Sequence, residues 1–187
     1  MDWTTQLVDQ LEWHWSAQLR PRLDGLTDDE YLWEPVPGCW SVRPRAEAIT
    51  NEAAGGGDLV LDYALPEPTP APITTIAWRL AHVIRGCLAF RTNSHFGGPP
   101  ADHETWEYAG TAAGALAQLD TTYAAWQAGV ESLGQKGLIR PVGPAEGPFA
   151  EAPYADLVLH INRELIHHGA EICLLRDLYR ATHQETS

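Results

Sequence analysis

The sequence predicts an all-α fold, a four-helix bundle with a long crossover loop between its first and second helices. Four segments repeat apolar residues every three or four positions, as the buried face of a helix does. Stretches rich in proline and glycine separate these segments, and no run of residues alternates convincingly as a strand would. A chain of 187 residues is long enough to bury a core without disulfides, so we expect a single domain over residues 1–187.

The first predicted helix covers residues 2–22, with an apolar stripe of Val8, Leu11, Trp15 and Leu19. A long irregular region follows, which includes GGG at residues 55–57 and PEPTPAP at residues 66–72. Connections of this length are usually functional or topological in a compact domain. We therefore expect the crossover of the bundle here.

The other three helices are bounded by recognisable start and stop signals. The second begins at Thr74 or Thr75, which are good capping residues, and ends before the Gly-Gly-Pro-Pro run at residues 97–100. The third covers residues 111–133. The fourth covers residues 153–182 and begins at Pro153, and its stripe consists of Leu157, Ile161, Glu164, His168, Ile172, Leu175 and Tyr179.

Charge and composition exclude several classes of partner. The formal net charge is −13 with only 12 Lys and Arg residues, which argues against nucleic acid, whose binding depends on basic side chains. No stretch of about 18 apolar residues predicts a membrane span, and the N-terminus lacks the pattern of an export signal. Three widely spaced cysteines suit a reducing cytoplasm. Cys87 and Cys173 are predicted packing residues, whereas Cys39, in PGCWS, is the candidate for an exposed, reactive thiol.

Glu164 and His168 form the strongest chemical signal, because both lie within the apolar stripe of the fourth predicted helix. Residues four apart lie one helical turn apart, a spacing that can chelate a divalent ion. His82, near the middle of the second predicted helix, is the best third ligand, with small neighbours that leave room for a cavity. Zinc is the first choice of ion; nickel, iron and manganese also accept imidazole and carboxylate.

The remaining polar residues near this pattern have weaker claims. We expect His160 at the rim of the site or as a further ligand, and Glu171 as a partner that orients a ligand. His167 is expected at the surface, and His14 either in the pocket or facing water. His95, His103 and His183 lie near predicted helix ends or in loops and are expected to be solvated.

The simpler interpretation is that these side chains have structural partners only. A Glu-x-x-x-His pair is common on helices, and a single buried histidine is more often hydrogen-bonded than a ligand. A carboxylate in a bundle core, however, costs several kcal/mol unless it is paired, protonated or bound to a cation. The stripe position of Glu164 therefore favours a metal site.

Three stretches carry a resemblance to a known family: EPVPGCWSVRP at residues 34–44, TTIAWRLAHV at residues 74–83 and ELIHHGAEI at residues 164–172. In this order they resemble the DinB-like superfamily, which includes thiol-dependent S-transferases and mycothiol-dependent maleylpyruvate isomerases. The resemblance implies a four-helix bundle whose divalent metal is held by His82, Glu164 and His168. Many members carry histidine at the position of Glu164, and glutamate there is more similar to the mycothiol-dependent isomerases. Residues 45–72 match only some variants.

The leading functional hypothesis is a metal-dependent transferase or isomerase that activates a low-molecular-weight thiol, such as mycothiol, toward a small electrophile. Trp15, Trp40 and Trp78 are candidates for an apolar pocket wall, and Arg79 or Arg85 for contact with an anionic group. A second hypothesis is a metal-binding bundle without turnover, active in storage, sensing or stress response. A third is a structural dimerisation module in which Glu164 and His168 only form ion pairs. The tryptophan-rich first helix is compatible with a homodimer.

Overall fold

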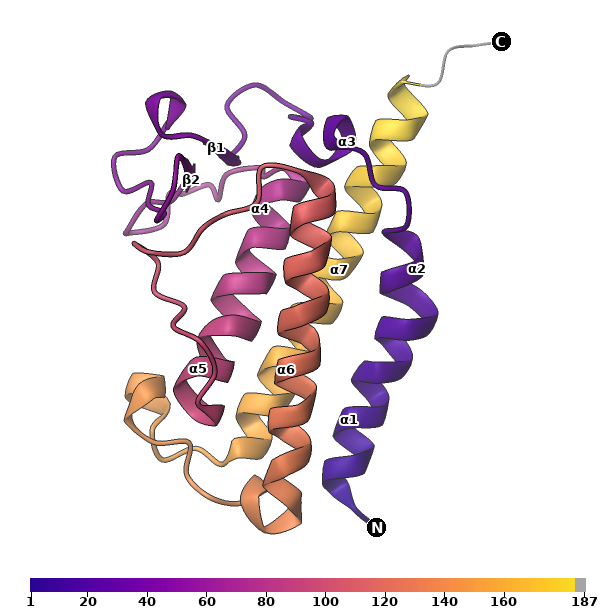
Figure 1. Ribbon diagram of the computed structural model, residues 1–187, viewed down its shortest axis with the longest axis vertical. Helices are drawn as coiled ribbons and strands as arrows, with labels where there is room; N and C mark the ends of the chain where they lie inside the picture. Colours follow the sequence, from indigo (N-terminus) through magenta and orange to yellow (C-terminus); the bar gives the residue numbers. More distant parts are fainter. Residues whose placement is uncertain (184–187) are drawn as a thin grey trace.

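Four long helical segments pack around an apolar core in the computed structural model, which describes residues 1–183 (Figure 1). They confirm the predicted all-α class and four-helix architecture. The first segment joins α1 (Trp3–His14), η1 (Trp15–Leu19) and α2 (Arg20–Arg22), and the second joins α4 (Ile76–Ala81), η3 (His82–Ala89) and α5 (Phe90–Phe96). The third is α6 (Ala112–Leu138), and the fourth is α7 (Tyr154–His183).

The ends of the helices follow the sequence signals closely. The hydroxyl of Thr75 accepts a hydrogen bond from the backbone N–H of Trp78 and caps α4. Gly97 ends α5 with a positive φ of 70°, a conformation that glycine adopts without steric cost. The third helix runs five residues beyond its predicted end at residue 133. Its helical geometry breaks at Gly134, with φ of 55°, so the predicted end coincides with a kink.

Two of the four segments contain π-helical stretches that the apolar pattern did not reveal. η1 interrupts the first segment, and η3 occupies the middle of the second, where His82 is its first residue. Hydrogen bonds in a π-helix join residues five apart, so such a stretch changes which side chains share a face. Isolated π turns inside α-helices are frequent at functional sites.

The irregular region between the first two long segments contains short elements that correct the expectation of no strands. It forms α3 (Asp28–Leu32), the single-turn η2 (Arg45–Glu47) and a two-stranded antiparallel sheet of β1 (Val42–Pro44) and β2 (Leu59–Leu61). The sheet lies beside the start of α4 (Figure 1). Val42 pairs with Leu61 and points into the core, so the region covers this end of the bundle instead of forming a free loop. A six-residue 3₁₀ element with a break at Gly147, η4 (Pro144–Phe149), precedes α7.

Cys39, proposed from sequence as exposed and reactive, lies in this region and is buried, with 1% of its surface exposed. Its thiol donates a hydrogen bond to the carbonyl of Val36. Burial raises the pKa of Cys39, which disfavours the thiolate form. The expectation of an exposed, reactive Cys39 is therefore wrong, and its role is packing.

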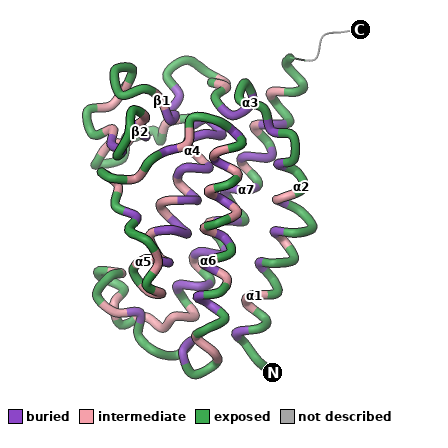
Figure 2. Tube along the Cα trace, in the orientation of Figure 1, coloured by how far each residue is buried: buried purple, intermediate pink, exposed green. Residues whose placement is uncertain are grey.

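The core draws on all four long segments, and buried residues recur along each of them (Figure 2). Its largest fully buried side chains include Leu11, Ile84, Trp126, Ile161 and Ile172. In the described part of the chain, no helix has both the length and the apolar composition that a membrane crossing needs.

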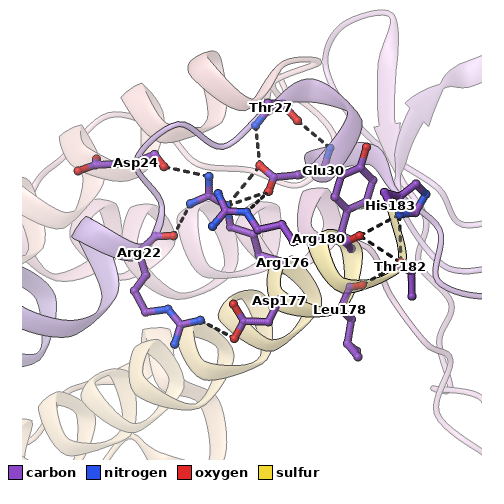
Figure 3. Close-up of polar contacts among 11 residues, drawn as sticks. Arg22, Asp24, Thr27, Glu30, Arg176, Asp177, Leu178, Arg180, Thr182 and His183 are labelled. Atoms are coloured by element: carbon purple, nitrogen blue, oxygen red, sulfur yellow. Dashed lines mark hydrogen bonds and ion pairs between the residues drawn. The ribbon is translucent and has the colours of Figure 1, made fainter. Parts of the chain in front are cut away.

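A buried ion pair fastens α3 to α7 (Figure 3). Both carboxylate oxygens of Glu30 accept from Nε of Arg176, at 3.1 and 3.2 Å, and Arg180 also donates to Glu30. The side chains of Glu30 and Arg176 are 4% and 3% exposed. Thr27 completes a capping box with Glu30 at the start of α3. This network holds the start of the crossover region against the C-terminal helix.

Candidate metal centre

His82, Glu164 and His168, the three predicted ligands, come together where η3 packs against α7. Oε2 of Glu164 lies 3.8 Å from Nε2 of His82 and 3.3 Å from Nε2 of His168. The two imidazole rings are almost perpendicular, with their centroids 4.7 Å apart. One carboxylate oxygen is thus shared by two ring nitrogens from different helices.

These separations suit a shared cation. Donor atoms that bind one tetrahedral zinc ion at about 2.0–2.3 Å lie roughly 3–4 Å from each other. The observed distances of 3.3 and 3.8 Å fall in that range. Nitrogen and oxygen donors of this kind bind zinc and other divalent ions. The set whose donor atoms all lie within 4.8 Å of one another is His82, Cys87 and Glu164, and His168 joins it through its contact with Glu164. The chemistry of these donors therefore fits a divalent metal ion.

Glu171 and Arg79 form a second layer behind His168. Nδ1 of His168 lies 2.6 Å from Oε2 of Glu171, which as a carboxylate accepts, and 3.4 Å from a guanidinium nitrogen of Arg79, which donates. The shorter contact is the stronger one and favours the proton on Nδ1. The lone pair of Nε2 then faces Glu164 and is available to a metal. Nε of Arg79 lies 3.2 Å from the same Glu171 oxygen and balances its charge. A carboxylate behind a ligating histidine is a common arrangement in metal sites.

His82 is held by stacking and is uncharged at neutral pH. Its ring lies parallel to that of Trp78, with centroids 5.4 Å apart. Burial, followed by the proximity of His168, lowers the pKa of His82 to about 4, although Glu164 acts in the opposite direction. A neutral imidazole has the free lone pair that metal binding requires.

Glu164 lies at the edge of the bundle core and not within it, with 23% of its side chain exposed. Burial by itself would raise the pKa of this carboxyl. His160, His168 and His82, followed by Arg163, outweigh that effect, so the pKa of Glu164 lies below its ordinary value. The carboxylate is therefore negatively charged at neutral pH and available as a ligand.

Cys87 is a potential ligand that the sequence analysis assigned to packing. Its sulfur lies 3.6 Å from Nε2 of His82, and donor atoms of His82, Cys87 and Glu164 all lie within 4.8 Å of one another. In an ideal α-helix, with 3.6 residues per turn, residues five apart point about 140° away from each other. The π-helical geometry of η3 removes that separation. The five-residue spacing of His82 and Cys87 can be read from the sequence, but the π-helical backbone that brings their side chains together cannot.

A cavity of about 460 Å³ opens beside His82, between the crossover region and the second helical segment. Its size lies within the range of small-molecule pockets. Two of the predicted wall residues, Trp40 and Trp78, line it, with ring centroids 6.1 Å apart. Arg85 also lines it, with Nε hydrogen-bonded to the carbonyl of Ala101.

The other predicted pocket residues lie elsewhere. Trp15 stacks on Tyr123 in the core, with ring centroids 3.9 Å apart, and is not a wall of this cavity. His14 lines a separate groove between the first segment and α7. Arg79 is turned toward Glu171, as described above. His160 lies at the rim, with Nδ1 3.7 Å from Oε1 of Glu164.

His167 is largely exposed, with Nε2 3.4 Å from Oε1 of Glu171. Donor atoms of His167, His168 and Glu171 form a second group within 4.8 Å. Nδ1 of His168 is already in contact with Glu171. We therefore interpret this group as a support for the first site and not as a second metal site. His183, at the end of α7, is exposed, as expected.

Two histidines expected to be solvated have buried surroundings instead. The side chain of His95 is 1% exposed, and its Nε2 lies 2.9 Å from Glu146. His103 lines the cavity beside His82, with Nδ1 3.0 Å from the hydroxyl of Tyr108. Both belong to segments next to Gly/Pro-rich turns, where helical periodicity gives no information about burial.

Comparisons with known proteins agree with this geometry. The family model described as the DinB superfamily matches residues 10–172, a span that reaches into all four helical segments and contains every candidate ligand. No curated protein and no solved structure matches the sequence significantly. The chain belongs to the DinB superfamily.

Proposed function

We propose that this protein is a divalent-metal-dependent transferase or isomerase that activates a low-molecular-weight thiol for attack on an electrophile. The observation that carries the proposal is the meeting of His82 and His168 at one oxygen of Glu164. His82 also lines a cavity. Membership of the DinB superfamily supports a metalloprotein of this kind. The proposed ligands are His82, Glu164 and His168.

A divalent ion held by these ligands would supply positive charge that lowers the pKa of a nearby thiol, which would favour the thiolate at neutral pH. Free thiols have a pKa of about 8.5 and are mostly protonated at pH 7. Zinc suits the donor set best, and nickel, iron and manganese are the alternatives to be distinguished by elemental analysis.

The residues around the cavity have separate roles in this proposal. Trp40 and Trp78 provide apolar walls that exclude water from the reacting atoms and contact the electrophile. Arg85 provides the positive charge on the cavity wall that an anionic group of the second substrate would meet. Arg79, whose guanidinium pairs with Glu171, keeps His168 oriented and does not contact substrate in this scheme.

The proposal is tested by incubating metal-loaded protein with a panel of small thiols and monochlorobimane. The thiol sulfur forms a bond to the carbon of the reagent, and chloride leaves with the bonding electrons. We expect metal-dependent conjugation with at least one thiol, and its loss in His82→Ala. The proposal would be contradicted if the rate of conjugation stayed at its uncatalysed value for every thiol tested, with and without metal.

A second candidate function is a metal-binding bundle without turnover, and the position of Cys87 favours it. Cys87 would add a protein donor close to His82 and Glu164, and sites closed by four protein donors are typical of structural metal sites. In the same assay, bound metal without conjugation of any thiol would support this candidate over the enzyme.

A further inference from the structure

The thiol of Cys87 faces the candidate metal centre. We infer that Cys87 is a metal ligand in the resting protein, and that an incoming thiol substrate takes its place. The inference rests on the proposed metal site and deepens the proposed function. It assigns to this chain a sulfur donor in addition to the nitrogen and oxygen donors of His82, Glu164 and His168.

The local backbone brings Cys87 to the site. His82 and Cys87 are five residues apart, and both belong to the π-helical stretch η3, whose hydrogen bonds join residues five apart. The sulfur lies 3.6 Å from Nε2 of His82, the same ring nitrogen that faces Glu164. This distance also falls within the roughly 3–4 Å that separates donors of one zinc ion. A regular α-helix would turn Cys87 away.

The sulfur of Cys87 has few alternative polar partners. The residue is 3% exposed, and among the described residues the only hydrogen-bond partner of its thiol is Nε2 of His82. Cys173, by contrast, lies beside Arg22 and Asp177 on the other side of α7, away from the candidate ligands. Cys87 is thus the one cysteine of this chain whose sulfur is directed at metal-ligating side chains.

Burial, followed by the nearby Glu164, raises the pKa of Cys87 to about 12, so a thiolate at this position requires the charge of a bound divalent ion. Glu164 and a thiolate at Cys87 together offset the two positive charges of a divalent ion, while His82 and His168 contribute neutral nitrogens. A neutral assembly avoids the large cost of an uncompensated charge in a partly buried site. Sulfur ligation also favours zinc over the harder ions of the alternatives, manganese above all.

Ligation by Cys87 has a consequence for binding of an external thiol. With four protein donors, a tetrahedral ion has no free position. A substrate thiol would therefore take the place of the Cys87 sulfur, and its proton would pass to the released Cys87 thiolate, so that charge balances. Cys87 would then be an internal competitor. Removing this competitor is expected to tighten the binding of the external thiol, even though it weakens the binding of the metal.

Cobalt substitution tests the inference directly, because Co²⁺ bound to sulfur shows a near-ultraviolet charge-transfer band that nitrogen and oxygen ligands do not give. Purified protein is stripped of metal, loaded with Co²⁺ in buffer free of added thiol, and compared with Cys87→Ala, Cys87→Ser and Cys173→Ala. We expect the band in wild type and in Cys173→Ala and its loss in both Cys87 variants. Zinc affinity should fall at least about tenfold in the Cys87 variants, given the size of effects from outer residues alone.

Absence of the band in wild type, or its persistence in both Cys87 variants, would overturn the inference. Cys87→Ser changes the side chain by one atom and serves as the folded comparison if the alanine variant does not fold. The band can be present in a protein that conjugates no thiol, in which case the proposed enzyme fails while the ligand assignment stands. Conjugation of a thiol by a protein that lacks the band would support the proposed enzyme and overturn the assignment of Cys87 as a ligand.

A thiol titration tests the displacement step separately. In wild type, adding the thiol that supports conjugation should change the charge-transfer band without abolishing it, as one sulfur replaces another. In Cys87→Ser, the same thiol should produce a charge-transfer band. The thiol concentration needed for this should be lower than the concentration that changes the band of wild type. A higher concentration requirement in the variant would show that Cys87 does not compete with substrate.

Discussion

Nε2 of His82 on η3 lies 3.8 Å from Oε2 of Glu164 on α7. These two residues are far apart in the sequence, and they meet because the second and fourth helical segments pack against each other. The pair connects the cavity on one side with the second layer of His168 and Glu171 on the other. Its position explains why a carboxylate is tolerated at a largely apolar helix interface.

Replacement of Arg176 by methionine should destabilise the fold strongly. The substitution leaves Glu30 buried without its main partner, and breaking a buried ion pair on one side costs about 3–5 kcal/mol. Asp177→Asn is the matched control, because its ion pair with Arg22 is about half exposed on both sides and is worth at most about 1 kcal/mol. Urea unfolding measures both variants, and equal losses would show that the Glu30–Arg176 pair does not fasten α3 to α7.

Acid should weaken the fold through the same carboxylate. Burial alone would raise the pKa of Glu30, but hydrogen bonds from Arg176, from the backbone of Thr27 and from Arg180 outweigh it and lower the pKa. A carboxyl with a lowered folded-state pKa stabilises the protein above its unfolded-state pKa, and this contribution is lost as pH falls through the folded-state value.

We therefore expect wild type to lose stability from about pH 4.5 downward. Glu30→Gln should lose less over the same interval, because it has no carboxyl to protonate. Urea midpoints measured from pH 7 to pH 3 compare the two proteins. Parallel curves would show that Glu30 does not contribute to the acid sensitivity.

Glu171→Gln should weaken metal binding without abolishing it. The substitution removes the charge that holds the proton on Nδ1 of His168 and keeps Nε2 free. Loss of such outer partners typically costs 10–100-fold in metal affinity. Competition with a chromogenic chelator measures the affinity, and Glu131→Gln, on the exposed surface of α6, is the control. An unchanged affinity in Glu171→Gln would place His168 outside the metal site.

Saturating zinc should raise the melting temperature of wild type and not that of His82→Ala. A ligand at 100 times its Kd stabilises the folded state by about 2.7 kcal/mol. For a domain of this size that corresponds to a shift of roughly 5–10 °C. The melting temperature of each protein is measured with zinc and with a chelator, and the two values are subtracted. The effect of the alanine substitution on stability without metal is therefore removed from the comparison. A similar shift in both proteins would assign the effect to metal bound elsewhere.

The sequence allowed the helices to be predicted because their signals are local. Apolar periodicity, the threonine before α4 and the glycine after α5 depend only on neighbouring residues. The small sheet was not predicted, because strands of three residues carry no alternation long enough to recognise. The burial of Cys39 and His95 follows from loops folding over the bundle, which depends on contacts between distant segments.

Proximity between two side chains of the same helix could be predicted where the helix is regular, but not where it is irregular. Glu164 and His168 lie one α-helical turn apart, so their proximity could be inferred directly. Cys87 could not be placed near His82, because a regular α-helix, with a rotation of about 100° per residue, would point the two side chains in different directions. The π-helical stretch η3 brings them together instead. Trp15 was misplaced for a related reason, since a stripe shows that a face is buried but not which helix covers it.

Elemental analysis of the purified protein tests the central claim most directly. After expression in metal-replete medium, wild type is expected to carry a stoichiometric divalent ion, most of it zinc, whereas His82→Ala and a Glu164→Ala, His168→Ala double variant carry little. Cys173→Ala, which leaves the site intact, should retain the content of wild type. A wild type without a stoichiometric ion, or variants that retain it in full, would contradict the account of three side chains sharing one cation.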